Sequence, residues 1–130
     1  MSEIAASKIS ALGIDTSNYT TSAAVVRDDL SYQNSKKLLP VPEGTLGLRQ
    51  SDAVFAHVKQ FSEVFGTLDL SDEKIRAVGV SSRPRSVEGS YMPCFLFGVS
   101  AAHTAAKTLG VPLYEFSHQQ GHIAAAICPC

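Results

Sequence analysis

The chain has little excess charge of either sign. Eleven lysines and arginines stand against twelve aspartates and glutamates, which argues against a protein that holds nucleic acid mainly by bulk charge. RNA held by a local patch or by a partner subunit stays open. Hydrophobic residues make up 45% of the chain and charged residues 18%, so we expect a globular fold. A length of 130 residues predicts one domain.

Cysteines and long apolar runs are also scarce. The three cysteines are Cys94, Cys128 and Cys130. Their odd number and spacing give no disulfide framework. The longest apolar run, Met92–Ala102, is interrupted by a proline and a serine and is too short to span a bilayer. Met1–Ser7 lacks the pattern of a signal peptide. We therefore expect a soluble cytoplasmic protein without a membrane partner.

Apolar and β-branched runs separated by turn residues predict five strands. Their approximate ranges are Ile9–Ile14, Thr21–Val26, Ser31–Leu38, Ile75–Val80 and Val111–Phe116. Helical spacing predicts a first helix whose apolar face carries Val54, Val58, Phe61, Phe65 and Leu68. A second helix is expected over Met92–Leu109, ended by Gly110, and a third from His118 onward.

The fold class that follows is α/β, with a mixed five-stranded sheet and the order β-β-β-α-β-α-β-α. Three strands with short links form an antiparallel meander, and two right-handed crossovers add parallel strands with helices on the faces of the sheet. This is the order of the ribonuclease H-like fold. The expected core is Ile14, Val25, Val58, Phe61, Phe65, Val78, Val80, Leu96 and Leu113.

A histidine pair, His118 and His122, follows the fifth predicted strand. On a helix, positions four residues apart share a face, so the two imidazoles can hold one zinc or iron ion. A third ligand must come from elsewhere. The alternative is that one histidine caps the helix and the other is half-buried. A zinc knot that adds Cys128 and Cys130 fits the usual ligand spacing poorly. His57 and His103 are expected to be ordinary helix residues.

Two loops are further candidates for ligand binding. The turn Asp15-Thr16-Ser17-Asn18 follows the first strand and carries a carboxylate, hydroxyls and an amide. It is either a phosphate- and cation-facing turn or an Asx-type turn that only closes the hairpin. Arg83 and Arg85 lie where a strand ends. They could bind a phosphate or an RNA backbone, or they could form a solvated charged loop.

Three segments together resemble the amino-terminal lobe of the TsaD/Gcp family, once called O-sialoglycoprotein endopeptidases. They are Gly13-Ile14-Asp15-Thr16-Ser17, the strand Ala77–Ser81 before a proline loop, and the pair His118 and His122 after a Val-Pro strand. The resemblance covers roughly Ile9–Ile127. It implies an actin-like ATPase protein of two ribonuclease H-like lobes, of which residues 1–130 are one, with the second lobe absent.

The resemblance also implies a function. Family members transfer a threonylcarbamoyl group from an adenylate to a tRNA adenosine, so tRNA, ATP or the adenylate, and one divalent metal ion (iron or zinc) are the expected partners and cofactors. His118 and His122 would be metal ligands, and Asp15, Thr16, Ser17 and Asn18 would face the nucleotide. An isolated lobe should be inactive, and no catalytic residue is assigned.

The chain departs from the family pattern at three places. Asn18-Tyr19-Thr20 stands where acidic residues are usual, Arg83-Pro84-Arg85 replaces a Gly-Pro-Gly loop, and Gln120 replaces an acidic residue between the histidines. These departures indicate a divergent paralogue. The alternative function is therefore that of a non-catalytic TsaB-like partner or scaffold. Self-association is a further expectation. A metallopeptidase (glycoprotease) has little support, because the histidines lack an accompanying glutamate base.

Overall fold

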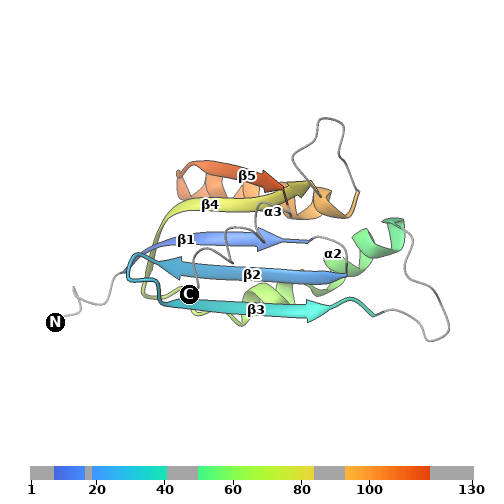
Figure 1. The fold of residues 1–130 in the computed structure, drawn as a ribbon, viewed down its shortest axis with the longest axis horizontal. Coiled ribbons are helices and arrows are strands. Elements are labelled where there is room, and N and C mark those ends of the chain that lie inside the picture. Colours follow the sequence, from blue (N-terminus) through green and yellow to red (C-terminus); the bar gives the residue numbers. More distant parts are fainter. Residues whose placement is uncertain (1–7, 17–18, 41–49, 84–92, 118–130) are drawn as a thin grey trace.

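The computed structural model describes residues 8–16, 19–40, 50–83 and 93–117. Within these ranges lie five strands and two helices (Figure 1). The strands are β1 (Lys8–Asp15), β2 (Thr20–Arg27), β3 (Tyr32–Leu38), β4 (Glu73–Arg83) and β5 (Leu113–Ser117). The helices are α2 (Gln50–Gly66) and α3 (Cys94–Leu109). The predicted third helix, from His118 onward, lies outside the described residues.

The strands form one mixed sheet in the order β3-β2-β1-β4-β5. β1, β2 and β3 pair antiparallel, whereas β4 pairs parallel with both β1 and β5. The mixed five-stranded sheet predicted from the sequence is therefore confirmed. Both pairings that involve β4 contain a register shift, between Ser10 and Ala11 on β1 and between Ser81 and Arg83 on β4. Such bulges bend a strand and re-aim its side chains, here at the end of β4.

Both described helices cover the same face of the sheet, behind it in Figure 1. Alternate residues of β1, β2 and β4 point into this layer, as the two-residue period of a strand requires. The buried cluster they form with the helices contains Leu12, Ile14, Ala23, Val25, Val64, Leu68, Val78, Val80, Ala102 and Ala106. As predicted, α3 ends at Gly110, whose φ of 70° is the left-handed conformation that glycine adopts readily.

The predicted core is mostly confirmed, with two errors. Ile14, Val25, Val78 and Val80 are buried, and Phe61, Phe65 and Leu113 pack against the cluster. Val58 and Leu96, however, are 48% and 50% exposed. Val58 is exposed because the buried line of α2 runs through Ala53, His57, Gln60 and Val64, about one position away from the predicted stripe. Leu96 lies in the first turn of α3, where Cys94 and Phe95 are the buried residues.

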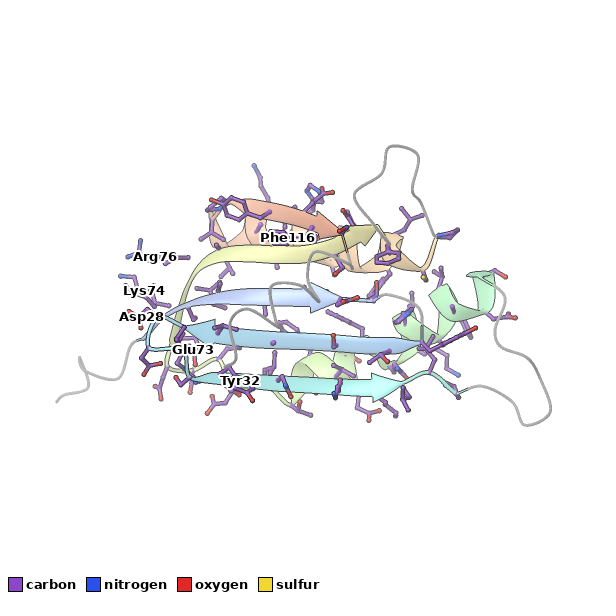
Figure 2. All side chains as sticks on the ribbon, viewed as in Figure 1. Asp28, Tyr32, Glu73, Lys74, Arg76 and Phe116 are labelled. Atoms are coloured by element: carbon purple, nitrogen blue, oxygen red, sulfur yellow. The ribbon has the colours of Figure 1, made fainter. Side chains whose placement is uncertain are left out.

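The opposite face of the sheet carries small residues in its centre. Gly13 pairs with Ala24 on one side and Gly79 on the other. Gly79 leaves room for the ring of Phe116 on β5, because a Cβ there would lie 3.2 Å from a ring carbon. Phe116 is half-exposed, as is Tyr32 on the outer strand β3 (Figure 2). Neither α2 nor α3, the two helices described, has the length and hydrophobicity of a membrane-spanning helix.

Candidate functional site: the carboxyl ends of the parallel strands

The parallel strands β1, β4 and β5 end at the same edge of the sheet, and polar residues stand at each end. β1 ends at Asp15, β4 at Arg83 and β5 at Ser117. In open α/β sheets, ligands bind outside the carboxyl ends of the strands. This carboxyl edge is therefore the candidate site, and the sequence placed Asp15 and Arg83 at it.

Asp15 is oriented by hydroxyls from two neighbouring strands. The Ser81 hydroxyl of β4 donates a hydrogen bond to Asp15 Oδ2 at 3.1 Å. The Ser22 hydroxyl of β2 donates to the Asp15 backbone carbonyl at 3.4 Å. The Asp15 side chain is half-buried. A carboxylate at the carboxyl end of a strand can coordinate a hydrated cation, since its oxygens are hard ligands of the kind that Mg²⁺ prefers.

Thr16 has a different environment from its neighbour Asp15. It is fully buried, and its hydroxyl is hydrogen-bonded to the backbone of α3 at both Cys94 and Gly98. Successive residues of an extended chain point to opposite sides, so Thr16 faces the helical layer while Asp15 points to the opposite face of the sheet. The two predicted site residues are adjacent in the chain, but Asp15 contacts a neighbouring strand whereas Thr16 contacts α3.

Several predicted site residues lie outside the described residues. They are Ser17, Asn18, Arg85, His118, His122, Cys128 and Cys130. His118 is covalently next to Ser117, the last residue of β5 and a fully buried one. Among the residues that the structure does describe, no group of three or more histidine, cysteine, aspartate or glutamate side chains could hold a metal ion.

A buried polar cluster near the same edge was missed from the sequence. Thr21 on β2 lies next to Ser22, whose backbone pairs with Asp15. Its Oγ1 is 2.7 Å from His57 Nδ1, and Gln60 Nε2 donates to the same oxygen at 2.9 Å and to the Lys37 carbonyl at 3.0 Å. Thr21 and His57 are fully buried. His57 is therefore more than an ordinary helix residue: it anchors α2 to β2.

The signal for this cluster is present in the sequence. Ala53, His57, Gln60 and Val64 follow helical spacing as well as the apolar stripe does. Two polar residues at core positions are costly unless they are hydrogen-bonded, so a buried polar partner is expected for them. Thr21 is that partner. The prediction chose the other face of the helix because Val54 and Val58 make it more apolar in sequence.

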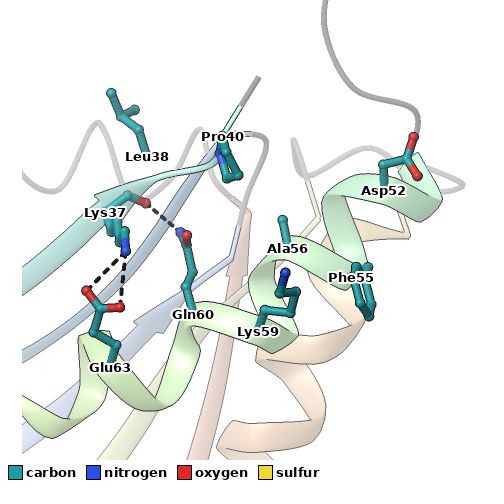
Figure 3. A pocket seen from close by; sticks show the side chains of 9 residues that line it. All are labelled: Lys37, Leu38, Pro40, Asp52, Phe55, Ala56, Lys59, Gln60 and Glu63. Carbon is teal, nitrogen blue, oxygen red and sulfur yellow. Dashed lines mark hydrogen bonds and ion pairs between the residues drawn. The ribbon is translucent and has the colours of Figure 1, made fainter. Parts of the chain in front are cut away.

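A separate groove lies between the end of β3 and α2 (Figure 3). Its volume is about 570 Å³, and the exposed ring of Phe55, the Lys37–Glu63 ion pair and Lys59 line it. The Lys59 ammonium lies 5.4 Å from the centre of the Phe55 ring. None of the predicted site residues lines this groove.

Comparison with known proteins supports the resemblance. No protein-family model matches the chain. A probable bifunctional tRNA threonylcarbamoyladenosine biosynthesis protein of Methanocorpusculum labreanum is 34% identical over 113 residues, which cover 86% of this chain and 20% of that protein. A tRNA N6-adenosine threonylcarbamoyltransferase of Phocaeicola vulgatus is 30% identical over 118 residues, or 88% of this chain and 33% of that protein. The chain thus spans a fifth to a third of the length of these relatives.

A solved structure supports the fold. YeaZ from Pseudomonas aeruginosa matches with a TM-score of 0.50 and 14% identity, over 83% of this chain and 43% of that one. At this identity the match speaks for the fold alone, and it agrees with the ribonuclease H-like assignment. Over most of its length the chain is therefore related to the tRNA threonylcarbamoyladenosine biosynthesis proteins of the TsaD/Gcp type.

Proposed function

We propose that this chain is one lobe of a two-lobe protein that transfers a threonylcarbamoyl group to a tRNA adenosine. The names of the relatives support the reaction class. The fraction of those relatives that the chain spans supports the assignment to a single lobe. In this proposal the carboxyl edge is one wall of a cleft for ATP or the adenylate, and the second lobe supplies the other wall.

The observation that carries the proposal is the hydrogen bond between Ser81 and Asp15. It joins the carboxyl ends of two adjacent parallel strands, which are 66 residues apart in the chain. The bond holds the Asp15 carboxylate at this end of the sheet. We assign Asp15 to the cation that accompanies the nucleotide phosphates, and Ser17 and Asn18 of the following turn to the phosphates themselves. The predicted phosphate contact of the Thr16 side chain is left out of this proposal, because that side chain is buried against α3.

His118 and His122 are the proposed metal ligands. The described residues contain no complete ligand set, so a metal site needs donors outside them. Two neutral imidazoles suit zinc or iron and leave positions for a third ligand and the substrate. When bound, the metal would act as a Lewis acid toward the oxygens of the adenylate. Asp15 would orient the nucleotide cation from β1, which β4 separates from β5 in the sheet.

A metal titration tests the histidine assignment. An open site with two protein ligands should hold metal weakly, so we expect the chain to purify with little zinc or iron. Added zinc should bind weakly, and His118→Ala should remove that binding. His103→Ala is the matched control, because His103 is an exposed histidine of α3 next to Glu115. Tight stoichiometric metal that survives His118→Ala would contradict the assignment and favour ligation by Cys128 and Cys130.

A second candidate function is that of a non-catalytic, TsaB-like partner. Exposed apolar side chains on the two helices favour it, namely Phe55 and Val58 on α2 and Leu96 on α3. Apolar side chains gathered on one helical layer mark an interaction surface when they form a patch. Sedimentation analysis distinguishes the two functions. A dimer that Val58→Asp dissociates, in a chain that binds neither nucleotide nor metal, would favour the scaffold.

A further inference from the structure

The hydroxyl of Thr16 lies within the first turns of α3. It donates a hydrogen bond to the Cys94 carbonyl at 2.9 Å and accepts one from the Gly98 N–H at 3.1 Å. Cys94 and Gly98 are four residues apart, so these are the two groups that an ordinary helical hydrogen bond would join. The side chain of Thr16 thus bridges the backbone ladder of a helix that starts 78 residues later in the chain.

Gly98 provides the space for this bridge. A Cβ at position 98 would lie 2.6 Å from Thr16 Oγ1 and 3.2 Å from Thr16 Cγ2. Such a distance is far below van der Waals contact, and Thr16 is fully buried and has no room to retreat. Glycine is disfavoured in a helix interior relative to alanine. The close approach of the Thr16 hydroxyl is a physical reason for a glycine at this position.

Thr16 also determines where Asp15 can lie. The two residues share a peptide bond, and their side chains point to opposite sides of the chain. A shift of Thr16 relative to α3 would therefore move the Asp15 carboxylate relative to Ser81. We propose that Thr16 is a positioning residue: its buried hydroxyl locks the end of β1 against α3 and so holds Asp15 in place for the nucleotide cation. The role in nucleotide binding rests on the proposed function, whereas the coupling of Thr16 to Gly98 does not.

A double-mutant cycle on the full chain tests the coupling without any ligand. Gly98→Ala should lower Tm clearly, because the new methyl group meets Thr16 Oγ1. In the background of Thr16→Ala the same substitution should cost much less, since the remaining Cβ of residue 16 would lie 3.4 Å away, in ordinary contact. Losses of Tm that simply add would overturn the coupling. Ser10→Ala is the control, because the buried Ser10 hydroxyl on the same strand has no hydrogen-bond partner among the residues that the structure describes.

Binding of ADP–Mg²⁺, followed by amide NMR shifts, tests the positioning role. Thr16→Ser keeps the hydroxyl and should bind like the wild type, whereas the isosteric Thr16→Val should bind roughly tenfold more weakly, as the loss of about one hydrogen bond predicts. The carbon shift of the Asp15 carboxyl group, measured without ligand, should move in Thr16→Val and stay unchanged in Thr16→Ser. If Thr16→Val does not fold, Gly98→Ala takes its place. This variant keeps the Thr16 hydroxyl but displaces it, so it should also move the carboxyl carbon signal of Asp15. An unmoved Asp15 signal in these variants would overturn the positioning role. An absence of nucleotide binding in the wild type, with the Asp15 signal moving, would instead count against the proposed function.

Discussion

The two ends of the sheet hold their carboxylates in different ways. At the end where β1 and β4 begin, the guanidinium of Arg27 donates through Nε to Glu73 Oε2 at 2.8 Å, and Nη2 contacts the same oxygen. At the carboxyl edge, Asp15 accepts from the hydroxyl of Ser81. Glu73 has a side chain that is 1% exposed, whereas Asp15 is only half-buried. One carboxylate is paired with a guanidinium inside the fold, and the other accepts a hydrogen bond from a hydroxyl at the carboxyl edge.

The two ends of the sheet therefore differ in role: we link the amino end, where β1 and β4 begin, to stability and the carboxyl edge to binding. The amino end gathers many charged groups, of which Asp28, Glu73, Lys74 and Arg76 are seen together in Figure 2. There the Gln33 amide also bonds both the N–H and the carbonyl of Asp69. The ion pair between Arg27 and the buried Glu73 carboxylate at this end contributes to the stability of the sheet. We therefore expect substitutions at the amino end to change stability, and substitutions at Asp15 to change binding.

The largest expected effect is at the amino end. Arg27→Ala leaves the Glu73 carboxylate buried without its cation and should lower the free energy of unfolding by about 3 kcal/mol. Denaturant titration measures this. The paired replacement Arg27→Met with Glu73→Leu should recover most of the loss, because it removes the buried charge. Lys37→Ala, at the exposed pair with Glu63, should cost less than about 1 kcal/mol. If Arg27→Ala and Lys37→Ala lowered the free energy of unfolding equally, the expected difference between the buried and the exposed ion pair would be wrong.

A smaller loss is expected at the buried cluster near the carboxyl edge. Thr21→Val removes the oxygen that contacts both His57 Nδ1 and Gln60 Nε2 while keeping the shape of the side chain. A buried polar group without its partner costs about 1–3 kcal/mol, so we expect a destabilisation of roughly 2 kcal/mol. Thr21→Ser, which retains the hydroxyl, is the control. If Thr21→Val had the same free energy of unfolding as the wild type, the cluster would not anchor α2.

The smallest effect concerns pH. Hydrogen bonds from the side chain and backbone of Ser71 lower the pKa of Asp69 from its usual value of 3.8. A carboxyl group whose pKa is lowered by folding contributes stability above its unfolded pKa, and this contribution is lost as the pH falls through the folded pKa. We expect a small decrease in stability below about pH 4 that Ser71→Ala reduces. An Asp69 carboxyl signal that titrates at its ordinary value by NMR would refute this.

Much of the fold could be predicted because it depends on local patterns. Alternating burial in β2 and glycine at the end of α3 are visible in short windows of sequence. The burial of Val58 was predicted wrongly because two sets of residues in α2 both follow helical spacing. The set that contains His57 and Gln60 is the buried one, since both residues hydrogen-bond to Thr21 on β2. Leu96 lies beside two buried residues in a first turn, where periodicity is weakest.

The site was harder to predict than the fold. Asp15 could be placed at a strand end from its turn, but its partner could not be. The contact with Ser81 depends on the parallel register of β1 and β4, which places Ile14 opposite Val80. Likewise, the contact of Thr16 with Gly98 requires α3 to dock at one position on the sheet. Sequence patterns define elements, while these contacts depend on how distant elements meet.

The most direct test of the central claim is an amide NMR titration of the chain with ADP–Mg²⁺. We expect shifts at the carboxyl edge, at Asp15 and Ser81, with no comparable shifts at Arg27 or Glu73. Asp15→Ala should weaken the binding, and Asp28→Ala, at an exposed carboxylate of the opposite end, should leave it unchanged. Shifts confined to the amino end, or the same affinity in Asp15→Ala as in the wild type, would contradict the account.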